Sequence, residues 1–490
     1  MRSFGNFVGG AIGMLALTSH ASPITPWKRA LSFDYGSEKV RGVNLGGWFV
    51  LEPWITPSVF EGNAAKDEYT LTQILGKDAA KSRLTEHWNS WITQDDFSQI
   101  AAAGLNHVRI PIGYWSVIAR DGDPYVQGAY EKFGQALDWA SGAGLKVMID
   151  LHGAPGSQNG FDNSGRHGSI EWTQGDTTEF TIKVLNKLRD DHADHPAVSA
   201  IQLLNEPLGP TLDMNKVRQF YMDGWGNLKD SNVAIVVHDA FQGVTSWNDW
   251  GAGMWNLVLD THHYEIFDNS QVGMSIDDHI RTACDFGNQM ASTGKTTISG
   301  EWTGAITDCA KWLNGKDKGA RYDGTLNGAP RVGDCAGKST GSVAGLSDAD
   351  KSNVRRFIEA QLDAYEKAGG WIFWTWKTEG APEWDMQELL AGGLFPQPLN
   401  NRQRKSSSYP PPLFSLLLPF NESGMYCAVG RGACRRGSSA TNPSTPHPKI
   451  PNRSCISHIA IAIPILTDIC RPRSMRLDNA GKAKQSKAMQ

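Results

Sequence analysis

The sequence contains 490 residues, enough for one large barrel or for two to three ordinary domains. Its formal net charge of −4 is unevenly distributed, because residues 1–403 contain 34 Lys and Arg against 48 Asp and Glu, whereas residues 404–490 contain 13 against 3. The acidic body argues against nucleic acid as a partner. Tryptophan is frequent, at 18 residues, and its flat faces suit sugar rings as well as large protein cores.

The amino-terminal residues have the composition of a secretory signal. A weakly basic start precedes an apolar, glycine-rich stretch over residues 7–17, and Ser19-His20-Ala21 fits a cleavage site. We therefore interpret residues 1–21 as a signal peptide. Residues 22–29 end in the dibasic pair Lys28-Arg29 and are interpreted as a propeptide, with an ordinary surface pair as the alternative. The apolar stretch is too short to span a membrane, so we expect a secreted protein without a membrane partner.

Eight short apolar runs in the body of the chain predict buried strands. They cover residues 40–45, 106–111, 146–150, 201–204, 234–237, 257–260, 297–300 and 370–376. Segments with helical patterns lie among them, at residues 64–75, 80–103, 130–143, 172–192, 215–228 and 348–368. Runs that are apolar throughout are typical of a parallel sheet buried on both faces. The pattern predicts an α/β protein with a single (β/α)8 TIM barrel over residues 30–403.

The character of the sequence changes after residue 403. Residues 404–490 are basic, rich in Pro, Ser, Arg and Cys, and show no periodicity that would bury a core. Their longest apolar run, residues 456–465, is short and contains Pro464, so it does not predict a membrane span. We interpret this part as a tail of low structure that results from an error in the gene model; a basic interaction tail is the alternative.

Two glutamates come directly after predicted strands. Glu206 follows a buried run and is itself followed by Pro207, which cannot continue a sheet, and Glu301 ends the run 297–300. Because strand ends meet at one end of a parallel barrel, these residues suggest the carboxylate pair of a retaining glycosidase, with no metal or other cofactor. Asn205 beside Glu206 suits a hydrogen bond to the sugar 2-hydroxyl, which makes Glu206 the acid/base and Glu301 the nucleophile. We further expect a raised pKa for Glu206; a structural ion pair is the alternative for either glutamate.

Seven stretches resemble fungal exo-β-1,3-glucanases of glycoside hydrolase family five. The resemblance covers roughly residues 30–403, and its most specific stretches are DLHGAPGSQNG at 150–160 and WTWKTE at 374–379. The others are RGVNLGGW at 41–48, HVRIPIGYW at 107–115, LNEP at 204–207, HHY at 262–264 and GEW at 300–302. The resemblance implies the same barrel and the same roles for Glu206 and Glu301.

The resemblance also implies roles for further residues. Arg109 and Tyr264 would hold the nucleophile ionised and aligned, and His152 and His262 would be pocket residues. Glu52 and Asp162 would bind the hydroxyls of one terminal glucose, with Trp374 beneath it and the pair Phe161 and Phe267 around the next sugar. Taken singly, Arg109 also fits a structural salt bridge, each histidine a core position and each phenylalanine a packing residue. No metal is implied.

Seven cysteines are present, an odd number for a secreted chain. The resemblance implies a disulfide between Cys309 and Cys335 and a second one from Cys284 to a cysteine near the carboxyl terminus of the family domain. The short ending that would carry that second cysteine is replaced by residues 404–490. We therefore expect Cys284 to lack its family partner, and either to be free or to pair with Cys427 or Cys434.

The sequence thus predicts a secreted, extracellular or wall-bound enzyme. The resemblance implies a monomeric, retaining exo-β-1,3-glucanase that releases glucose from the non-reducing ends of β-glucan polysaccharides or oligosaccharides, with transglucosylation as a side reaction. A β-1,6-glucanase, endo-glucanase or mannanase on the same barrel is one alternative. A catalytically inactive glucan-binding wall protein is another, against which the presence of both glutamates argues.

Overall fold

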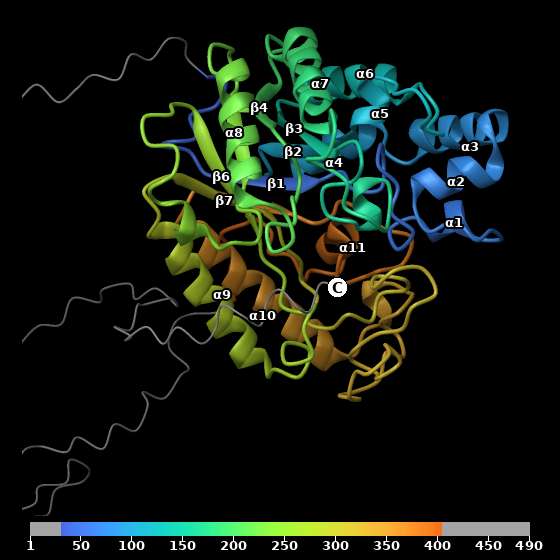
Figure 1. The fold of residues 1–490 in the computed structure, drawn as a ribbon. Coiled ribbons are helices and arrows are strands. Elements are labelled where there is room, and N and C mark those ends of the chain that lie inside the picture. The colour runs from blue at the N-terminus through green and yellow to red at the C-terminus, as the bar shows by residue number, and fades with distance from the viewer. Residues whose placement is uncertain (1–30, 404–490) are drawn as a thin grey trace, which may run out of the picture. The chain divides into compact units, whose positions relative to one another are not determined.

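The computed structural model describes residues 31–403, and these form a closed barrel of eight parallel strands in sequence order (Figure 1). The strands are β1 (Val40–Asn44), β2 (His107–Gly113), β3 (Lys146–Gly153), β4 (Val198–Gln202), β5 (Ala234–His238), β6 (Leu257–His262), β7 (Thr296–Glu301) and β8 (Gly370–Phe373). Closure is completed where Val40 of β1 pairs with Gly370 of β8. The predicted (β/α)8 fold class is confirmed.

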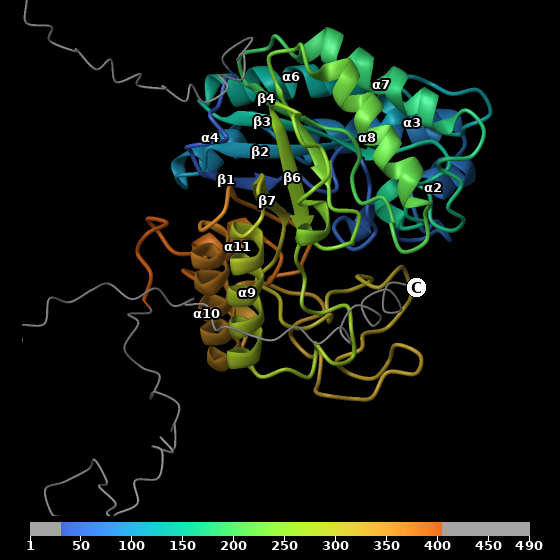
Figure 2. The same ribbon diagram turned by 60° about the vertical axis from the view of Figure 1, so that its left-hand side comes forward.

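Helices surround the barrel, as the two ribbon views show (Figures 1 and 2). They are α1 (Pro57–Phe60), α2 (Glu68–Leu75), α3 (Lys77–Ser90), α4 (Gln94–Ala102), α5 (Tyr114–Val117), α6 (Ala129–Gly142), α7 (Thr177–His192), α8 (Met214–Leu228), α9 (Ile276–Ala291), α10 (Asp348–Tyr365) and α11 (Met386–Ala391). Helices α9 and α10 lie side by side (Figure 2), and α9 packs against β7 and α10 against β8.

The centre of the barrel changes from apolar to polar along the strands. One cluster of fully buried side chains includes Val40, Met148, Val236 and Ile298, each from a different strand. Nearer the carboxyl ends, buried polar residues replace them: Asn44, Arg109, Asp150, Gln202 and Asp260, on β1, β2, β3, β4 and β6. Because buried polar groups need partners, this layer implies an organised network beneath the barrel's carboxyl end.

Several features differ from the sequence-based expectations, among them one divided helix, unpredicted helices and two strand ends. The segment predicted as one helix over 80–103 is two, because Thr93 caps α4 by accepting from the backbone of Asp96, whose side chain in turn accepts from the backbone of Thr93. Helix α9 was not predicted; it contains Gly287, which weakens a helix but permits close packing, since a Cβ there would lie 2.5 Å from the carbonyl oxygen of Ala364 on α10. Strands β4 and β8 end earlier than predicted, at Gln202 and Phe373.

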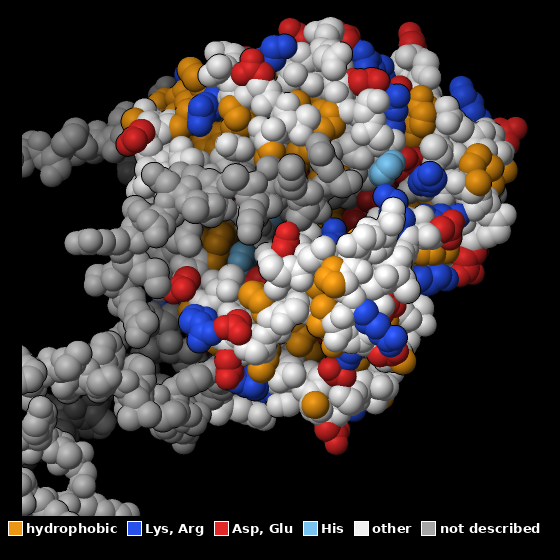
Figure 3. Space-filling model, turned by 60° about the horizontal axis from the view of Figure 1, so that its bottom comes forward, with side chains coloured by type: hydrophobic (Ala, Val, Ile, Leu, Met, Phe, Trp, Pro, Cys, Tyr) orange, Lys and Arg blue, Asp and Glu red, His pale blue; other side chains and the backbone are white. Residues whose placement is uncertain are grey.

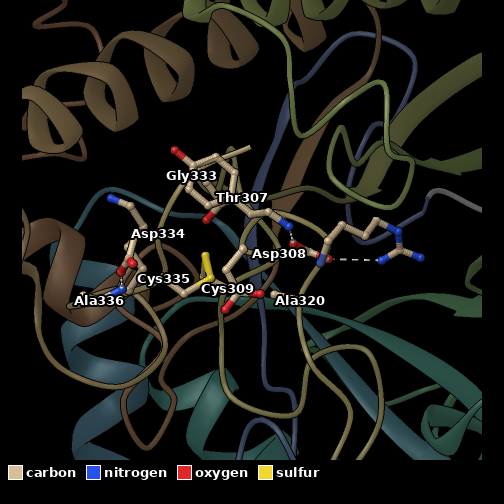
Figure 4. The surroundings of a disulfide bond; sticks show 12 residues. Thr307, Asp308, Cys309, Ala320, Gly333, Asp334, Cys335 and Ala336 are labelled. Atoms are coloured by element: carbon tan, nitrogen blue, oxygen red, sulfur yellow. Dashed lines mark hydrogen bonds and ion pairs between the residues drawn. A yellow bond between two sulfur atoms is a disulfide. The ribbon is translucent and has the colours of Figure 1, made fainter. Parts of the chain in front are cut away.

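A long connection between β7 and α10 is cross-linked by a disulfide (Figure 4). Cys309 is bonded to Cys335, 26 positions further along, as the resemblance implied. Beside it, the fully buried carboxylate of Asp308 accepts hydrogen bonds from the backbone N–H groups of Arg321 and Tyr322. The connection is therefore folded around its own buried anion and covalent link.

Cys284 on α9 is also disulfide-bonded. A free Cys284 is therefore excluded, whereas the alternative of a disulfide with Cys427 or Cys434 concerns residues outside the described part of the chain. The predicted signal peptide, propeptide and basic tail lie outside that part as well. Among residues 31–403, no helix is both long and apolar enough to cross a bilayer.

Candidate active site

The carboxyl ends of the barrel strands surround a pocket of about 570 Å³. Figure 3 looks toward this end of the barrel and shows acidic side chains deep in a hollow between the surrounding loops. The predicted residues that line the pocket are Glu52, Phe161, Asp162, Glu206, Tyr264, Phe267, Glu301 and Trp374. The other four, Arg109, His152, Asn205 and His262, have buried side chains and contact one or more of these residues or each other. The volume is in the ordinary range for a small-ligand site.

The two glutamates reach this pocket by different local geometries. Glu301 is the last residue of β7, so the strand itself positions it. Glu206 comes four residues after β4 and has a φ of +44°, a left-handed conformation that is strained for a residue with a side chain. Such strained conformations are concentrated at functional sites, where the surrounding structure holds them. Both side chains are almost fully buried, with exposures of 6% and 4% for Glu206 and Glu301.

The imidazole of His262 lies between the two carboxylates. Its Nδ1 is 2.6 Å from Oε1 of Glu206 and 3.4 Å from Oε2 of Glu301. The two oxygens are therefore within about 6 Å of each other. Carboxyl groups about 5–5.5 Å apart are typical of retaining glycosidases, whereas inverting enzymes separate them by about 6.5–9.5 Å to admit a water molecule. The spacing of this pair thus favours retention.

Arg109 links the nucleophile candidate to the polar layer of the barrel. Its guanidinium donates to Oε1 of Glu301 at 2.9 Å, to Oδ1 of Asn205 at 2.7 Å and to Oε1 of Gln202 at 2.8 Å. It also forms an ion pair with Asp150 at 3.1 Å, and all of these groups are buried. Because a planar guanidinium has donors in fixed directions, these contacts fix the orientation of Glu301 and Asn205 together.

The second oxygen of Glu301 is also bonded. The Tyr264 hydroxyl donates to Oε2 of Glu301 at 2.9 Å. The backbone N–H of Gly300 donates to Oδ1 of Asp260 at 2.7 Å, and a Cβ at Gly300 would lie only 2.2 Å from that oxygen. Glycine is thus required at this position so that Asp260 can approach β7. The orientation of Glu301 therefore depends on contacts from β2, the segment after β6 and β7 itself.

The protonation of the pair differs from the sequence-based prediction. Burial by itself raises the pKa of Glu206, but the hydrogen bond and positive charge of His262 outweigh it, so the pKa lies below its usual value. Burial raises the pKa of Glu301, with His262 and Arg109 opposing that rise and Glu206 adding to it. The predicted rise for Glu206 is therefore wrong for the empty site, because sequence spacing did not reveal the imidazole between the two carboxylates.

Several buried polar atoms around the pocket have no hydrogen-bond partner among the described residues. They include Oε1 of Glu52, Nε2 of His152, Nδ2 of Asn205 and Nε1 of Trp384. The other oxygen of Glu52 accepts from Nε1 of Trp54 at 2.9 Å. Since buried polar atoms are normally paired, these four are available to a ligand that carries hydroxyl groups. Asn205 in particular keeps its amide nitrogen free while Arg109 holds its oxygen.

The walls of the pocket combine acids and aromatic rings. Burial and the neighbouring Asp162 raise the pKa of Glu52 well above its usual value, and burial raises the pKa of Asp162 to about 7. The ring of Trp374 stacks on His152, with ring centres 5.6 Å apart. A protonated carboxyl group can both donate and accept, which suits sugar hydroxyls, whereas aromatic faces suit the C–H face of the ring.

The two predicted clamp residues come from separate connections. Phe161 follows β3, and Phe267 follows β6 and packs edge-to-face on Tyr264 with ring centres 5.6 Å apart. Both line the pocket. Residues from the disulfide-linked connection, including Asn314, Lys318 and Asn327, line it as well. The sequence interpretation did not include that connection, because the pattern of its residues gives no sign of which element it faces.

One group among the described residues has the spacing of metal ligands. It consists of Glu206, His238 and His262, whose ligand atoms lie within 4.8 Å of one another. Both ring nitrogens of His262, however, are at hydrogen-bond distance from carboxylate oxygens of Glu206 and Asp260, so both are needed as N–H donors. A metal-bound imidazole must offer a lone pair. We therefore assign this group to the hydrogen-bond network.

Four residues of the site, three of them fully buried, were not identified from the sequence. Asn44 accepts from Arg109 at 2.8 Å, Gln202 lies between Arg109 and Asp260, and Asn163 donates to Glu206 at 3.1 Å. The fourth, Asp260, contacts His262 at 3.2 Å. Three of them lie within or directly after an apolar strand run, where an isolated polar residue is a signal that could have been used.

Comparisons with known proteins agree with this geometry. Residues 74–318 match the family described as cellulase (glycosyl hydrolase family 5). A glucan 1,3-beta-glucosidase of Blumeria graminis is 52% identical over 400 residues, covering 79% of this chain and 94% of that protein. A probable glucan 1,3-beta-glucosidase A of Aspergillus clavatus is 55% identical over 378 residues, covering 76% of this chain and 91% of that protein.

The chain belongs to glycosyl hydrolase family 5. Among solved structures, the crystal structure of rutinosidase from Aspergillus niger covers 74% of this chain and 99% of its own, with a TM-score of 0.59 and 20% sequence identity. At that identity the likeness concerns the fold alone. The barrel fold is thus shared with a protein of a different name, so the function is inferred from the residues of the pocket and not from the fold.

Proposed function

We propose that the protein is a retaining exo-β-1,3-glucanase that releases glucose from the non-reducing ends of β-1,3-glucans. The observation that carries the proposal is the close pair Glu206 and Glu301 at the base of a pocket with unpaired sugar-binding groups. The relatives named glucan 1,3-beta-glucosidase give the linkage and the substrate class. The same names support removal of single glucose units, since a glucosidase releases glucose.

In the first step, the Glu301 carboxylate attacks the anomeric carbon while Glu206 gives a proton to the departing glycosidic oxygen. Arg109 donates to one oxygen of Glu301 and Tyr264 to the other, and these hydrogen bonds keep the carboxylate oriented toward the anomeric carbon. The free amide nitrogen of Asn205 would bind the sugar 2-hydroxyl. That interaction strengthens as the transition state forms, so it contributes to catalysis as well as to binding.

In the second step, Glu206 takes a proton from water, which attacks the glucosyl–Glu301 ester; Glu301 is released as a carboxylate and Glu206 regains its proton. A sugar hydroxyl that replaces this water would give transglucosylation. Phe161 and Phe267 at the pocket wall are the residues we assign to holding that second sugar, and Glu52, Asp162 and Trp374 are assigned to the first. His152, stacked on Trp374, would position that ring and offer its free Nε2.

We further propose that the protein is secreted and acts on wall or extracellular β-glucan as a monomer. The composition of residues 1–21 and the disulfide chemistry of Cys309 and Cys335 support secretion, because disulfides persist in oxidising compartments.

Product analysis of the full chain on laminarin tests the proposal. We expect glucose as the earliest product, released first as the β-anomer in proton NMR, and no product with Glu301→Gln. Oligosaccharides without early glucose would indicate an endo-glucanase, and α-glucose would indicate inversion. Binding of laminarin without any product would indicate an inactive glucan-binding protein instead.

A further inference from the structure

His262 is the point at which three carboxylates meet. Nδ1 faces Oε1 of Glu206 at 2.6 Å and Oε2 of Glu301 at 3.4 Å, and Nε2 faces Oδ2 of Asp260 at 3.2 Å. A neutral imidazole has one N–H group, and an ionised carboxylate accepts hydrogen bonds only. Two ring nitrogens that both face carboxylates therefore fit an imidazolium with two N–H groups, in a side chain that is fully buried.

The groups around the ring favour this charge. Besides the three carboxylates, the Tyr264 hydroxyl, the Arg109 guanidinium and the imidazoles of His152 and His238 lie in the same network or against it. The ring of His238 is 4.3 Å from that of His262, but its Nδ1 accepts from the backbone of Ala240, and burial holds its pKa well below the usual value, so it stays neutral. The negative charges nearest to His262 thus outweigh the positive ones.

The carboxyl group of Asp260 accepts hydrogen bonds from more than one strand of the barrel. It is fully buried, and it accepts from the Gly300 N–H at 2.7 Å and from Nε2 of Gln202 at 2.8 Å, in addition to His262. It lies on the barrel side of the imidazole, while Glu206 and Glu301 line the pocket. A sugar can therefore change the surroundings of the two glutamates without displacing Asp260.

This arrangement leaves the acid/base without the proton that its first step requires. In the empty site, the strong hydrogen bond from His262 favours an ionised Glu206, whereas leaving-group protonation needs a carboxylic acid. We infer that His262 stores the proton that Glu206 delivers, and that Asp260 is the positioning residue that keeps this proton on the imidazole until sugar binds. The inference rests on the proposed function and adds a proton source to it.

The proton balance closes over one turnover. When sugar displaces water from Glu206, the proton moves from Nδ1 of His262 to Oε1 of Glu206, and then to the glycosidic oxygen as the C1–O bond breaks and Glu301 bonds to C1. His262 is then neutral and Glu206 ionised, which is the state that a base needs. Glu206 takes a proton from the attacking water and returns it to His262 when the sugar leaves.

Activity on two substrates distinguishes a role of His262 and Asp260 in supplying a proton from a purely structural role. Laminaribiose has a poor leaving group that needs protonation, whereas 2,4-dinitrophenyl β-glucoside has one that leaves without it. We expect Asp260→Asn and His262→Gln to lower kcat/KM for laminaribiose about 10- to 100-fold and for the dinitrophenyl glucoside less than about threefold. In Asp260→Asn the loss of negative charge lowers the pKa of His262, so the alkaline limb of the laminaribiose profile should move to lower pH by about one unit.

The neighbouring histidine, His263, provides a matched control. His263→Gln changes the neighbouring histidine, which faces away from the pocket, and should affect both substrates equally. Equal losses for both substrates in the Asp260 and His262 variants, with an unchanged pH profile, would overturn the inference while leaving the glucanase function intact. If the wild-type chain itself fails to cleave laminaribiose, the proposed function fails instead.

A measurement on the wild-type protein covers the case in which a variant does not fold. Imidazole ¹⁵N chemical shifts should show both nitrogens of His262 protonated at neutral pH in the empty site, and one nitrogen losing its proton when a non-hydrolysed glucosyl inhibitor binds. A single protonated nitrogen in the empty site would overturn the inference.

Discussion

The pKa values of two adjacent histidines at the end of β6 are shifted in opposite directions. His262 points into the pocket, and the carboxylates of Glu301, Asp260 and Glu206 raise its pKa well above the usual value in spite of burial. His263 points outward, and burial lowers its pKa to about 3. Both side chains are buried, so burial alone does not decide their charge; the neighbouring groups do.

On the outward side of the same segment, a cluster of buried polar and aromatic side chains packs beneath α9 and α10. Nδ1 of His263 lies 2.7 Å from the Tyr365 hydroxyl, and its ring stacks on Phe286 with centres 4.0 Å apart. Two residues further, the carboxyl of Glu265 lies 2.9 Å from Nδ1 of His279. Burial raises the pKa of Glu265 to about 9 and lowers the pKa of His279 to about 4, so this acid and base are both uncharged at neutral pH.

The two sides of this segment differ in the groups that surround the ionisable side chains. On the inside, Arg109 and the backbone N–H of Gly300 stabilise carboxylates, which in turn stabilise the imidazolium of His262. On the outside, the partners are the Tyr365 hydroxyl and the His279 imidazole, and burial favours the neutral forms of the groups there. We therefore expect changes on the inner side to alter catalysis, and changes on the outer side to alter stability.

The largest effect is expected for a matched pair of glutamate substitutions. Glu301→Gln removes the nucleophile and should lower kcat on laminarin by about 10⁴-fold or more, with an unchanged melting temperature. Glu265→Gln, which alters a buried glutamate on the outer side, should leave kcat within about threefold of wild type. Similar losses of kcat in both variants would contradict the expectation that only changes on the inner side alter catalysis.

The acid/base assignment gives the next largest effect. Glu206→Ala should lower kcat/KM for laminaribiose on the order of 10³-fold, because the departing oxygen then leaves without a proton. With an activated aryl glucoside, added azide should restore turnover and give β-glucosyl azide, since the small anion needs no base. Formation of α-glucosyl azide, or no effect of azide, would contradict the role of Glu206.

A smaller effect, on stability, is expected on the outer side. Because the folded-state pKa of Glu265 is raised to about 9, its stabilising contribution is full below the unfolded-state pKa and is lost as pH rises toward 9. Glu265→Gln stays neutral, so its free energy of unfolding should exceed that of wild type increasingly as pH rises, by ~4 kcal/mol at pH 8 relative to pH 5. Denaturant unfolding at several pH values measures this; parallel curves for the two proteins would contradict a protonated Glu265.

Much of the fold could be predicted because each strand is a short apolar run with a clear end. The two glutamates were found for the same reason, since each follows such a run. The contacts between strands could not be predicted in this way. Asp260 and His262 are two residues apart, but only the barrel brings Glu206 and Glu301 to the same imidazole, and this contact reverses the expected pKa shift of Glu206.

The outer cluster was missed for a related reason. His263, Glu265, His279 and Tyr365 come from three separate segments, and α9, which carries His279, has a glycine and many polar residues that weaken its helical pattern. Packing against α10 overrides that weak propensity. The pairing of Cys284 likewise involves a partner outside the described residues, which no local pattern identified.

Covalent trapping tests the central assignment most directly. A 2-deoxy-2-fluoroglucoside with a good leaving group should inactivate the enzyme, and mass spectrometry of its peptides should place one fluoroglucosyl group on Glu301. Fluorine at C2 destabilises the transition states of both steps, and the good leaving group speeds only formation of the ester, so the intermediate accumulates. Label on Glu206 would contradict the roles assigned to the pair, and inactivation without label, together with α-glucose as the first product, would contradict retention itself.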